Sequence, residues 1–234
     1  MNFELTSTQA TVQQTFARFS DNVIAPAAAA LDEAGNFPRD IFRQLAALGF
    51  FGIRYPQSAG GSGMDLVSFC LALEEISRGS LAVAGCAAMQ SLMGTNFLFQ
   101  LGDQALHQRL LYPALQGEKI GAICMTEPDA GSDLGGIRTS ATRVPGGYRL
   151  NGQKMWVTSA PVADFFTVFA RAGDDERLTI FLVERDFEGL SVGRAIDKMG
   201  VRALPTSELA LNDCLVPDSH RLSKAEGDGE EHLR

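Results

Sequence analysis

Residues 124–133 read CMTEPDAGSD and residues 148–159 read YRLNGQKMWVTS, and these two stretches carry most of the information in the sequence. Each combines a strand-like apolar run with a short polar turn. Pro128 restricts the first turn, and Gly131 allows a positive φ or the close approach of another group. Backbone amides in such a turn can hold an anionic or carbonyl oxygen. The hydroxyls and the indole that should gather here belong to Thr126, Ser132, Thr158 and Trp156. The pattern predicts a wall for a flat, hydrogen-bonding cofactor.

Each part also has an ordinary interpretation when it is taken alone. The first stretch is compatible with a simple strand-to-loop turn. Trp156, the only tryptophan of the chain, is compatible with a core or interface aromatic residue. The combination of the two stretches favours the cofactor site.

Strand patterns dominate the chain after Glu118. Turn signals separate the runs, including PGG at 145–147, AGDDE at 172–176 and FEG at 187–189. Seven short strands of this kind predict a small antiparallel β-barrel or sandwich. The predicted strands are KIGAICMT, RTSATRV, YRLNGQKMWV, DFFTVFAR, LTIFLVE, LSVGRAI and SELALNDCLV.

Helical patterns dominate the first 117 residues, so the predicted fold class is α+β, with an all-α domain at 1–117 and a β domain at 118–218. Thr6 and Gln9 have the spacing of a capping box before a helix that Pro26 should kink or end. A second helix should begin near Pro38 and stop at Gly49. Its inward side chains are predicted to be Ile41, Phe42, Leu45 and Leu48.

Residues 81–101 are apolar on nearly every side and long enough to span a membrane. Gln90, Asn96 and Gln100 interrupt this run with amide side chains. A central buried helix is therefore predicted rather than a membrane span.

Composition narrows the class of protein. The 234 residues carry a formal net charge of −8, with 45% hydrophobic and 21% charged residues, which is typical of a globular protein. Lys and Arg are scattered, which argues against a nucleic-acid partner. The N-terminus MNFELTSTQA lacks the pattern of a secretory signal, so a cytoplasmic location is expected.

The remaining polar residues receive structural interpretations. Cys70, Cys86, Cys124 and Cys214 are far apart and do not cluster with histidines, so free thiols are predicted and no metal site. Asn151 and Gly152 have the sequence of a hairpin turn. Lys154 is interpreted as a solvated strand lysine, and residues 197–199 as a structural turn. Residues 219–234 are charged and glycine-bearing, which predicts a solvated linker.

The two stretches resemble the middle domain of the acyl-CoA dehydrogenase family. The family pattern is close to A-x-T-E-P-x-A-G-S-D. About twenty residues later, members of the family have a second pattern close to L-N-G-x-K-x-W-I-T-N. Flanking segments such as QRLLYPALQGEKIGA and FLVERDFEGLSVGRAIDKMG match in the same order. Nearly the whole chain is covered by the resemblance.

The resemblance implies an FAD site and the role of each residue in it. The backbone of Ile123, Cys124, Met125 and Thr126, with the Thr126 hydroxyl, would address the pyrimidine edge of the flavin. Gly131 and Ser132 would lie at the pyrophosphate, and Ser132 also at the bound thioester. Trp156 would pack on the isoalloxazine ring, and Thr158 would reach the flavin N5. Val157 and Ser159 stand where the family often has isoleucine and asparagine.

The family chemistry is the oxidation of an acyl-CoA to its trans-2-enoyl form. The catalytic glutamate of the family lies in a further helical domain, so no residue of 1–234 is expected to be the base. The resemblance also implies a homo-oligomer or a partner that supplies this domain, and an electron-transfer flavoprotein as electron acceptor. We expect the chain alone to bind FAD weakly and not to turn over. Two alternatives stay open: a flavin-dependent oxidase or monooxygenase, and a non-catalytic binding or assembly subunit of a split enzyme.

Overall fold

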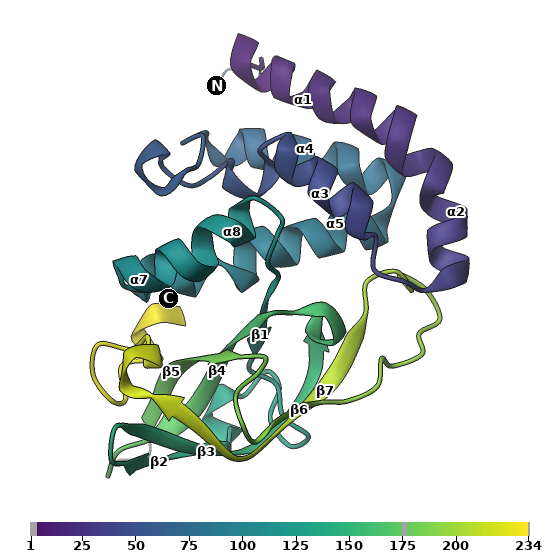
Figure 1. The fold of residues 1–234 in the computed structure, drawn as a ribbon. Coiled ribbons are helices and arrows are strands. Elements are labelled where there is room, and N and C mark those ends of the chain that lie inside the picture. Colours follow the sequence, from purple (N-terminus) through teal and green to yellow (C-terminus); the bar gives the residue numbers. More distant parts are fainter. Residues whose placement is uncertain (1–3, 175–176, 234) are drawn as a thin grey trace. The chain divides into compact units, whose positions relative to one another are not determined.

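The computed structural model describes residues 4–174 and 177–233. They form two compact units (Figure 1). The first contains Met1–Leu92, Tyr112–Lys119 and Asp197–Pro205, and the second contains Met93–Leu111, Ile120–Ile196 and Thr206–Arg234. The predicted α+β class, with helices first and strands after them, is confirmed.

The first unit is helical, and α1 packs along α4 (Figure 1). The predicted capping box is present, because the Gln9 N–H donates to Thr6 Oγ1 at 3.2 Å and the Thr6 N–H donates to Gln9 Oε1 at 3.0 Å. The main helices are α1 Ser7–Phe19, α2 Ala25–Ala34, α3 Arg39–Ala47, α4 Leu66–Gly79, α5 Leu81–Ala88 and α8 Tyr112–Leu115.

Proline positions explain where the first helices break. A π-helical turn, Ser20–Ile24, precedes Pro26, and the Ala25 N–H donates to the carbonyl of Ser20. Proline has no N–H and its ring clashes with the preceding turn, so a widened turn there lets α2 begin in a new direction. In α3 the predicted inward residues are buried except Leu48, which follows the last helical residue and is 40% exposed.

Helix α5 continues through the π-helical turn Met89–Gly94 toward α6 Asn96–Leu101. Among the described residues, Leu81–Leu101 is the single helical run that could cross a membrane by length and composition. Of its most apolar window, 61% is buried inside the structure, which is typical of a core helix.

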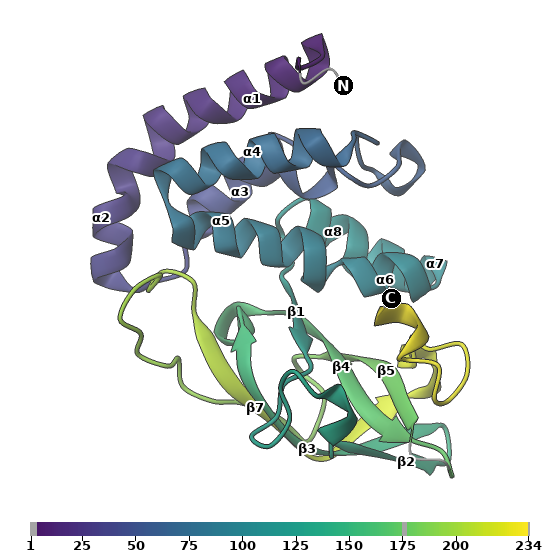
Figure 2. The same cartoon turned by 180° about the vertical axis from the view of Figure 1, so that it is seen from behind.

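The second unit contains a sheet of seven strands in the order β1-β4-β2-β3-β7-β6, with β5 also paired to β4 (Figures 1 and 2). It also contains α6 and the short helix α7 Gln104–Leu106. The strands are β1 Gly121–Cys124, β2 Ser140–Val144, β3 Gly147–Thr158, β4 Phe165–Ala172, β5 Arg177–Glu184, β6 Leu190–Val192 and β7 Thr206–Pro217. All seven predicted strands are present, although the first and the sixth are shorter than predicted.

The predicted β domain after the helical part is confirmed, and the sheet differs from a closed antiparallel barrel or sandwich in two details. The sheet is mixed, because β1 and β2 both run parallel to β4. It is also open, because β1 and β6 lie at the ends of the strand order. Apolar periodicity identifies a strand but not the direction of its neighbour, which is why the sequence did not reveal this arrangement.

Turns between the strands were predicted with mixed success. The tight connection from β2 to β3 is at Pro145 and Gly146, as predicted, and Gly146 has a φ of 82°. Asn151 and Gly152 do not form the predicted turn but lie inside β3. A Cβ on Gly152 would lie 2.4 Å from Thr139 Oγ1, so close packing explains this glycine. The predicted turn at 172–176 lies partly outside the described residues.

Residues 219–229 pack against β5 instead of standing free in solvent. The Leu222 N–H donates to the carbonyl of Ile180 at 2.9 Å, and the Gly229 N–H donates to the carbonyl of Leu178 at 2.8 Å. Leu222 is 2% exposed. The segment covers the free edge of β5, which an unpaired strand would otherwise present to other chains. The charged composition predicted a solvated linker, because the segment has few apolar residues and these, such as Leu222, are the ones that pack on the sheet. Residue 234 lies outside the described residues.

Replacement of Leu222 by alanine tests this packing. We expect Leu222→Ala to lower the free energy of unfolding by about 2–5 kcal/mol, because a buried leucine is lost and a cavity is left. Urea unfolding followed by circular dichroism measures the change. The control Leu215→Ala alters a leucine that is 52% exposed and should change stability by less than about 0.5 kcal/mol. Equal effects in both variants would contradict the packing of this segment.

Candidate functional site

The two motif stretches lie against each other in the second unit. The carboxyl end of β1 leads into the first stretch, and β3 carries the second. The Met155 N–H donates to the carbonyl oxygen of Thr126 at 2.8 Å. Lys154 Nζ lies 3.3 Å from the carbonyl oxygen of Met125. The segments that the sequence pattern paired therefore meet at the end of β1.

A β-bulge in β3 decides which side chains face outward. Lys154 lies opposite Leu209 and Val157 opposite Ser207, so β3 has one residue more than β7 between these pairs. Trp156 lies in this bulge with a φ of 56°, a left-handed conformation that is uncommon outside glycine. The bulge interrupts the two-residue alternation, so both Lys154 and Val157 are buried while Trp156 is 59% exposed.

Lys154 forms a buried ion pair that joins the two stretches. Its Nζ donates to Glu127 Oε1 at 2.7 Å and to the carbonyl oxygen of Phe169 at 2.7 Å. The Lys154 side chain is 0% exposed and that of Glu127 is 6% exposed. The Arg138 N–H donates to Glu127 Oε2 at 2.7 Å and the Thr139 N–H donates to Oε1 at 3.0 Å. The interpretation of Lys154 as a solvated lysine is wrong, because its three acceptors come from segments distant in sequence.

Burial and pairing act in opposite directions on these two groups. Burial would raise the pKa of Glu127, but hydrogen bonds from Lys154 and Thr139 outweigh it and hold that pKa below its usual value. Burial lowers the pKa of Lys154, and Glu127 opposes this shift. Each partner thus favours the charged form of the other.

Glu184, at the end of β5, is another partly buried carboxylate. Burial would raise its pKa, but Arg109 and His220 together lower it. Arg109 forms an ion pair with Glu184, and His220 Nε2 lies 2.8 Å from Glu184 Oε1. This cluster ties the π-helical turn His107–Leu111 to the sheet, and it contains none of the predicted site residues.

The predicted site residues differ in what they can offer to a ligand. Cys124 and Val157 can contribute only backbone groups because their side chains are buried, and burial raises the pKa of the Cys124 thiol to about 12. The others keep some or most of their surface. Ile123, Met125, Thr126 and Thr158 are partly buried, and Gly131, Ser132 and Trp156 are exposed.

Thr126 presents polar groups that the described residues do not use. Its carbonyl oxygen accepts from Met155, but no described residue accepts from its N–H or hydrogen-bonds its hydroxyl. It follows β1, which has a single partner strand, β4, among the described residues. A strand edge of this kind offers backbone groups to a ligand.

Two reasons were predicted for a glycine at position 131: a positive φ or the close approach of another group. The first is wrong, because Gly131 does not have a positive φ. A Cβ at this position would meet nothing within 4 Å in the structure. The second reason, close approach by a bound group, stays a prediction.

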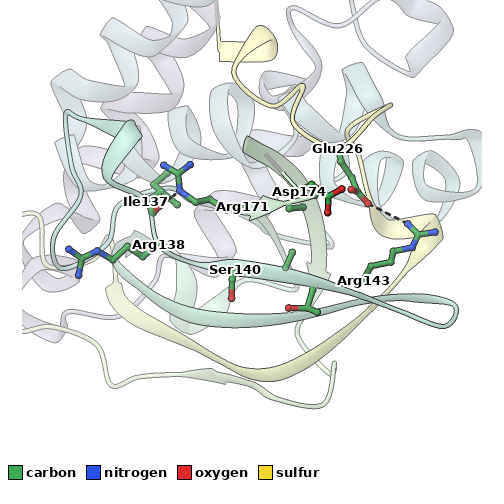
Figure 3. Close-up of a pocket in the computed structure, with 11 residues that line it drawn as sticks. Ile137, Arg138, Ser140, Arg143, Arg171, Asp174 and Glu226 are labelled. Carbon is green, nitrogen blue, oxygen red and sulfur yellow. Dashed lines mark hydrogen bonds and ion pairs between the residues drawn. The ribbon is translucent and has the colours of Figure 1, made fainter. Parts of the chain in front are cut away.

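A cavity of about 680 Å³ opens beside β2 and the end of β4 (Figure 3). Its walls carry both signs of charge, with Arg143 3.7 Å from Glu226 and the Arg171 guanidinium bonded to the carbonyl of Ile137 at 2.5 Å. None of the predicted site residues lines it.

Sequence reasoning missed Glu127 and Lys154 as the residues that hold the site together. One signal for this pair was available in the sequence: the first stretch contains an acidic residue, Glu127, and the second contains a basic residue, Lys154. Because the two stretches were expected to lie together, an ion pair between them could have been predicted. Among the described residues, no group of three or more His, Cys, Asp or Glu side chains could hold a metal ion. Cys70 is exposed, whereas Cys86, Cys124 and Cys214 are buried, and all four are free thiols.

Two family models match the chain. The N-terminal domain of acyl-CoA dehydrogenase matches residues 6–118, and its middle domain matches residues 122–214. The chain therefore belongs to the acyl-CoA dehydrogenase family.

Individual relatives agree with this assignment. Benzylmalonyl-CoA dehydrogenase from Aromatoleum aromaticum is 68% identical over 234 residues, which are 100% of this chain and 62% of that protein. A glutaryl-CoA dehydrogenase in complex with glutaryl-CoA has a TM-score of 0.94 and 32% identity, covering 100% of this chain and 60% of that one. The Mycobacterium smegmatis glutaryl-CoA dehydrogenase in complex with FADH2 has a TM-score of 0.90 and 30% identity, covering 95% and 57%. The chain thus spans less than two thirds of these relatives.

Removal of either charge of the buried pair should be strongly destabilising. We expect Lys154→Met and Glu127→Gln each to lower the free energy of unfolding by about 3–5 kcal/mol, because each leaves a buried group without its partner. The double variant should lose less than the sum of the two. The exposed pair Asp129–Arg138, with side chains 69% and 79% exposed, gives a matched control, Asp129→Asn with Arg138→Met, that should leave stability unchanged. Additive losses in denaturant unfolding would contradict the coupling.

The lowered pKa values of Glu127 and Glu184 predict a loss of stability in acid. Because the folded pKa lies below the ordinary value of 4.5, their contribution is complete above that pH and is lost as the pH falls through the folded pKa. Urea unfolding at about pH 7, 5 and 3.5 should show this decline in the wild type. The decline should be shallower in Glu127→Gln/Lys154→Met, and identical slopes would contradict the assignment to Glu127.

Proposed function

We propose that this chain is the FAD-binding part of a dehydrogenase that oxidises an acyl-CoA thioester between its α and β carbons. The observation that carries the proposal is the exposed indole of Trp156, next in sequence to the Met155 that bonds to Thr126, together with the Thr126 N–H and hydroxyl, which no described residue pairs. Family membership and the FADH2 complex of a structural neighbour support it.

The donor set fits a flavin in its chemistry. A flat ring with carbonyl and nitrogen acceptors needs an apolar face and several fixed donors, and the indole with the groups of residues 123–126 supplies both. FAD would supply the acceptor for the hydride that leaves the substrate β-carbon. The Thr158 hydroxyl would donate to the ring nitrogen that receives the hydride, and Trp156 would exclude water from one face. Gly131 and Ser132 would hold the pyrophosphate, with Ser132 also at the thioester.

The proposed substrate class rests on the similarity to benzylmalonyl-CoA dehydrogenase. Identity of 68% with benzylmalonyl-CoA dehydrogenase favours a CoA thioester that also carries an aromatic ring and a second carboxyl group. The same similarity favours a dehydrogenase over the oxidase, monooxygenase and assembly-subunit alternatives.

Several expectations stay predictions that follow from the family resemblance. They are a catalytic base outside residues 1–234, an oligomeric assembly, an electron-transfer flavoprotein as electron acceptor, and a cytoplasmic location. The domain bounds 1–117 and 118–218, with 219–234 leading toward a further domain, are proposed on the same ground.

FAD titration of the 234-residue chain tests the proposed function. Flavin fluorescence should be quenched on binding because the ring stacks on Trp156. Trp156→Leu should weaken binding about tenfold, since aromatic stacking is worth roughly 1–3 kcal/mol. Thr158→Val should weaken it by about fivefold, the equivalent of one hydrogen bond.

The control Leu215→Ala removes another exposed apolar side chain of the same sheet and should leave FAD binding unchanged. With FAD bound, benzylmalonyl-CoA should perturb the visible flavin band at lower concentration than butyryl-CoA does. Absence of FAD binding in the wild type would overturn the proposed function, and preference for butyryl-CoA would overturn the substrate class.

A further inference from the structure

We propose that Lys154 is a positioning residue that raises the reduction potential of the flavin, acting through the peptide group between Met125 and Thr126. The inference rests on the proposed function, because it requires FAD at the end of β1. It assigns a role in the cofactor chemistry to an ion pair that would otherwise be only structural.

Each hydrogen of the Lys154 ammonium group has a hydrogen-bond acceptor. An ammonium group has three hydrogens, and Nζ has three acceptors: Glu127 Oε1 at 2.7 Å, the Phe169 carbonyl at 2.7 Å and the Met125 carbonyl at 3.3 Å. Because the side chain is 0% exposed, water does not screen these interactions and the local dielectric is low. The positive charge is therefore held against the Met125 carbonyl.

One planar peptide group connects this carbonyl to the ligand side. The Met125 C=O and the Thr126 N–H belong to the same resonant unit, so a cation at the oxygen makes the N–H a stronger donor. No described residue accepts from that N–H. The Thr126 carbonyl is bonded to the Met155 N–H at 2.8 Å, which fixes the following peptide group and limits rotation of the donor.

Glu127 does not cancel this effect, because its charge is spread over several donors. Besides Lys154, the carboxylate accepts from the Arg138 N–H, the Thr139 N–H and the Thr139 hydroxyl. The two oxygens thus also accept hydrogen bonds from Arg138 and Thr139, the two residues just before β2. The carboxylate holds Lys154 in place while the Met125 carbonyl keeps its own contact with the cation.

The direction of the effect follows from the charge that reduction adds. Reduction of bound FAD by two electrons and one proton would add one negative charge to the pyrimidine side of the flavin, the side that the family resemblance assigns to residues 123–126. A strengthened, fixed donor at that edge stabilises the reduced form more than the oxidised form. The result is a higher potential with little change in the affinity for oxidised FAD.

The first test is the potential of the double variant Glu127→Gln/Lys154→Met, which removes both charges and keeps side chains of similar length. Equilibration with a reference dye measures the potential. We expect the affinity for reduced FAD relative to oxidised FAD to fall about tenfold, equal to about 30 mV for a two-electron couple. The matched control, Asp129→Asn/Arg138→Met, removes the same two charges at an exposed pair nearby and should leave the potential unchanged.

The outcomes separate the possible failures. A lower potential in the double variant alone supports the inference. Equal weakening of both FAD forms with an unchanged potential would mean a purely structural role and would overturn it. Failure of the wild type to retain FAD would overturn the proposed function instead.

A measurement on the wild type avoids any dependence on the folding of a variant. Met125–Thr126 is the only Met-Thr pair in the sequence, so labelling with carbonyl-¹³C methionine and ¹⁵N threonine gives one assigned amide signal. We expect the Thr126 amide proton to move downfield when FAD binds and further downfield when the flavin is reduced. A proton shift that does not change on reduction would overturn the inference.

Discussion

The buried ion pair between Lys154 and Glu127 is the constraint on which the arrangement of the site depends. It joins a strand residue to a turn residue and brings in the carbonyls of Met125 and Phe169. Neither charge can be left alone in a low-dielectric interior without a cost of several kcal/mol. The turn after β1, strand β3 and strand β4 must therefore come together in one geometry.

The bulge at Trp156 follows from the same requirement. In a regular strand Lys154 and Trp156 would share one face, and Val157 would share the other with Met155. Burial of both Lys154 and Val157 requires one extra residue, and Trp156 occupies that position with a positive φ. Such a conformation costs about 1–3 kcal/mol and is found where the surroundings fix it, often at functional sites. The inward lysine and the outward indole are two results of one irregularity.

The sequence allowed most of the elements and the composition of the site to be predicted, but not its internal connections. All seven strands were predicted, because apolar runs bounded by turn residues are a local signal. The break of the first helix at Pro26 was predictable for the same reason. Strand direction, the bulge and the burial of Lys154 depend on contacts between distant segments, which periodicity does not report. Asn151 and Gly152 were misleading because a turn sequence can also satisfy a crowded strand position beside Thr139.

The energetics of the ion pair explain why stability alone is a poor account of it. Well-packed apolar side chains can often replace a buried salt bridge with no loss of stability. Such replacements would, however, leave the Met125 carbonyl without its cationic partner and the Thr126 N–H as an ordinary donor. The indole and the Thr126 groups contact a ligand only if they are exposed at the site. In the proposal, the donor strength of the Thr126 N–H depends in addition on the buried charge of Lys154. A buried lysine that contacts the carbonyl of a peptide group whose N–H no described residue accepts therefore agrees better with the proposed role at the flavin than with a role in the stability of the sheet alone.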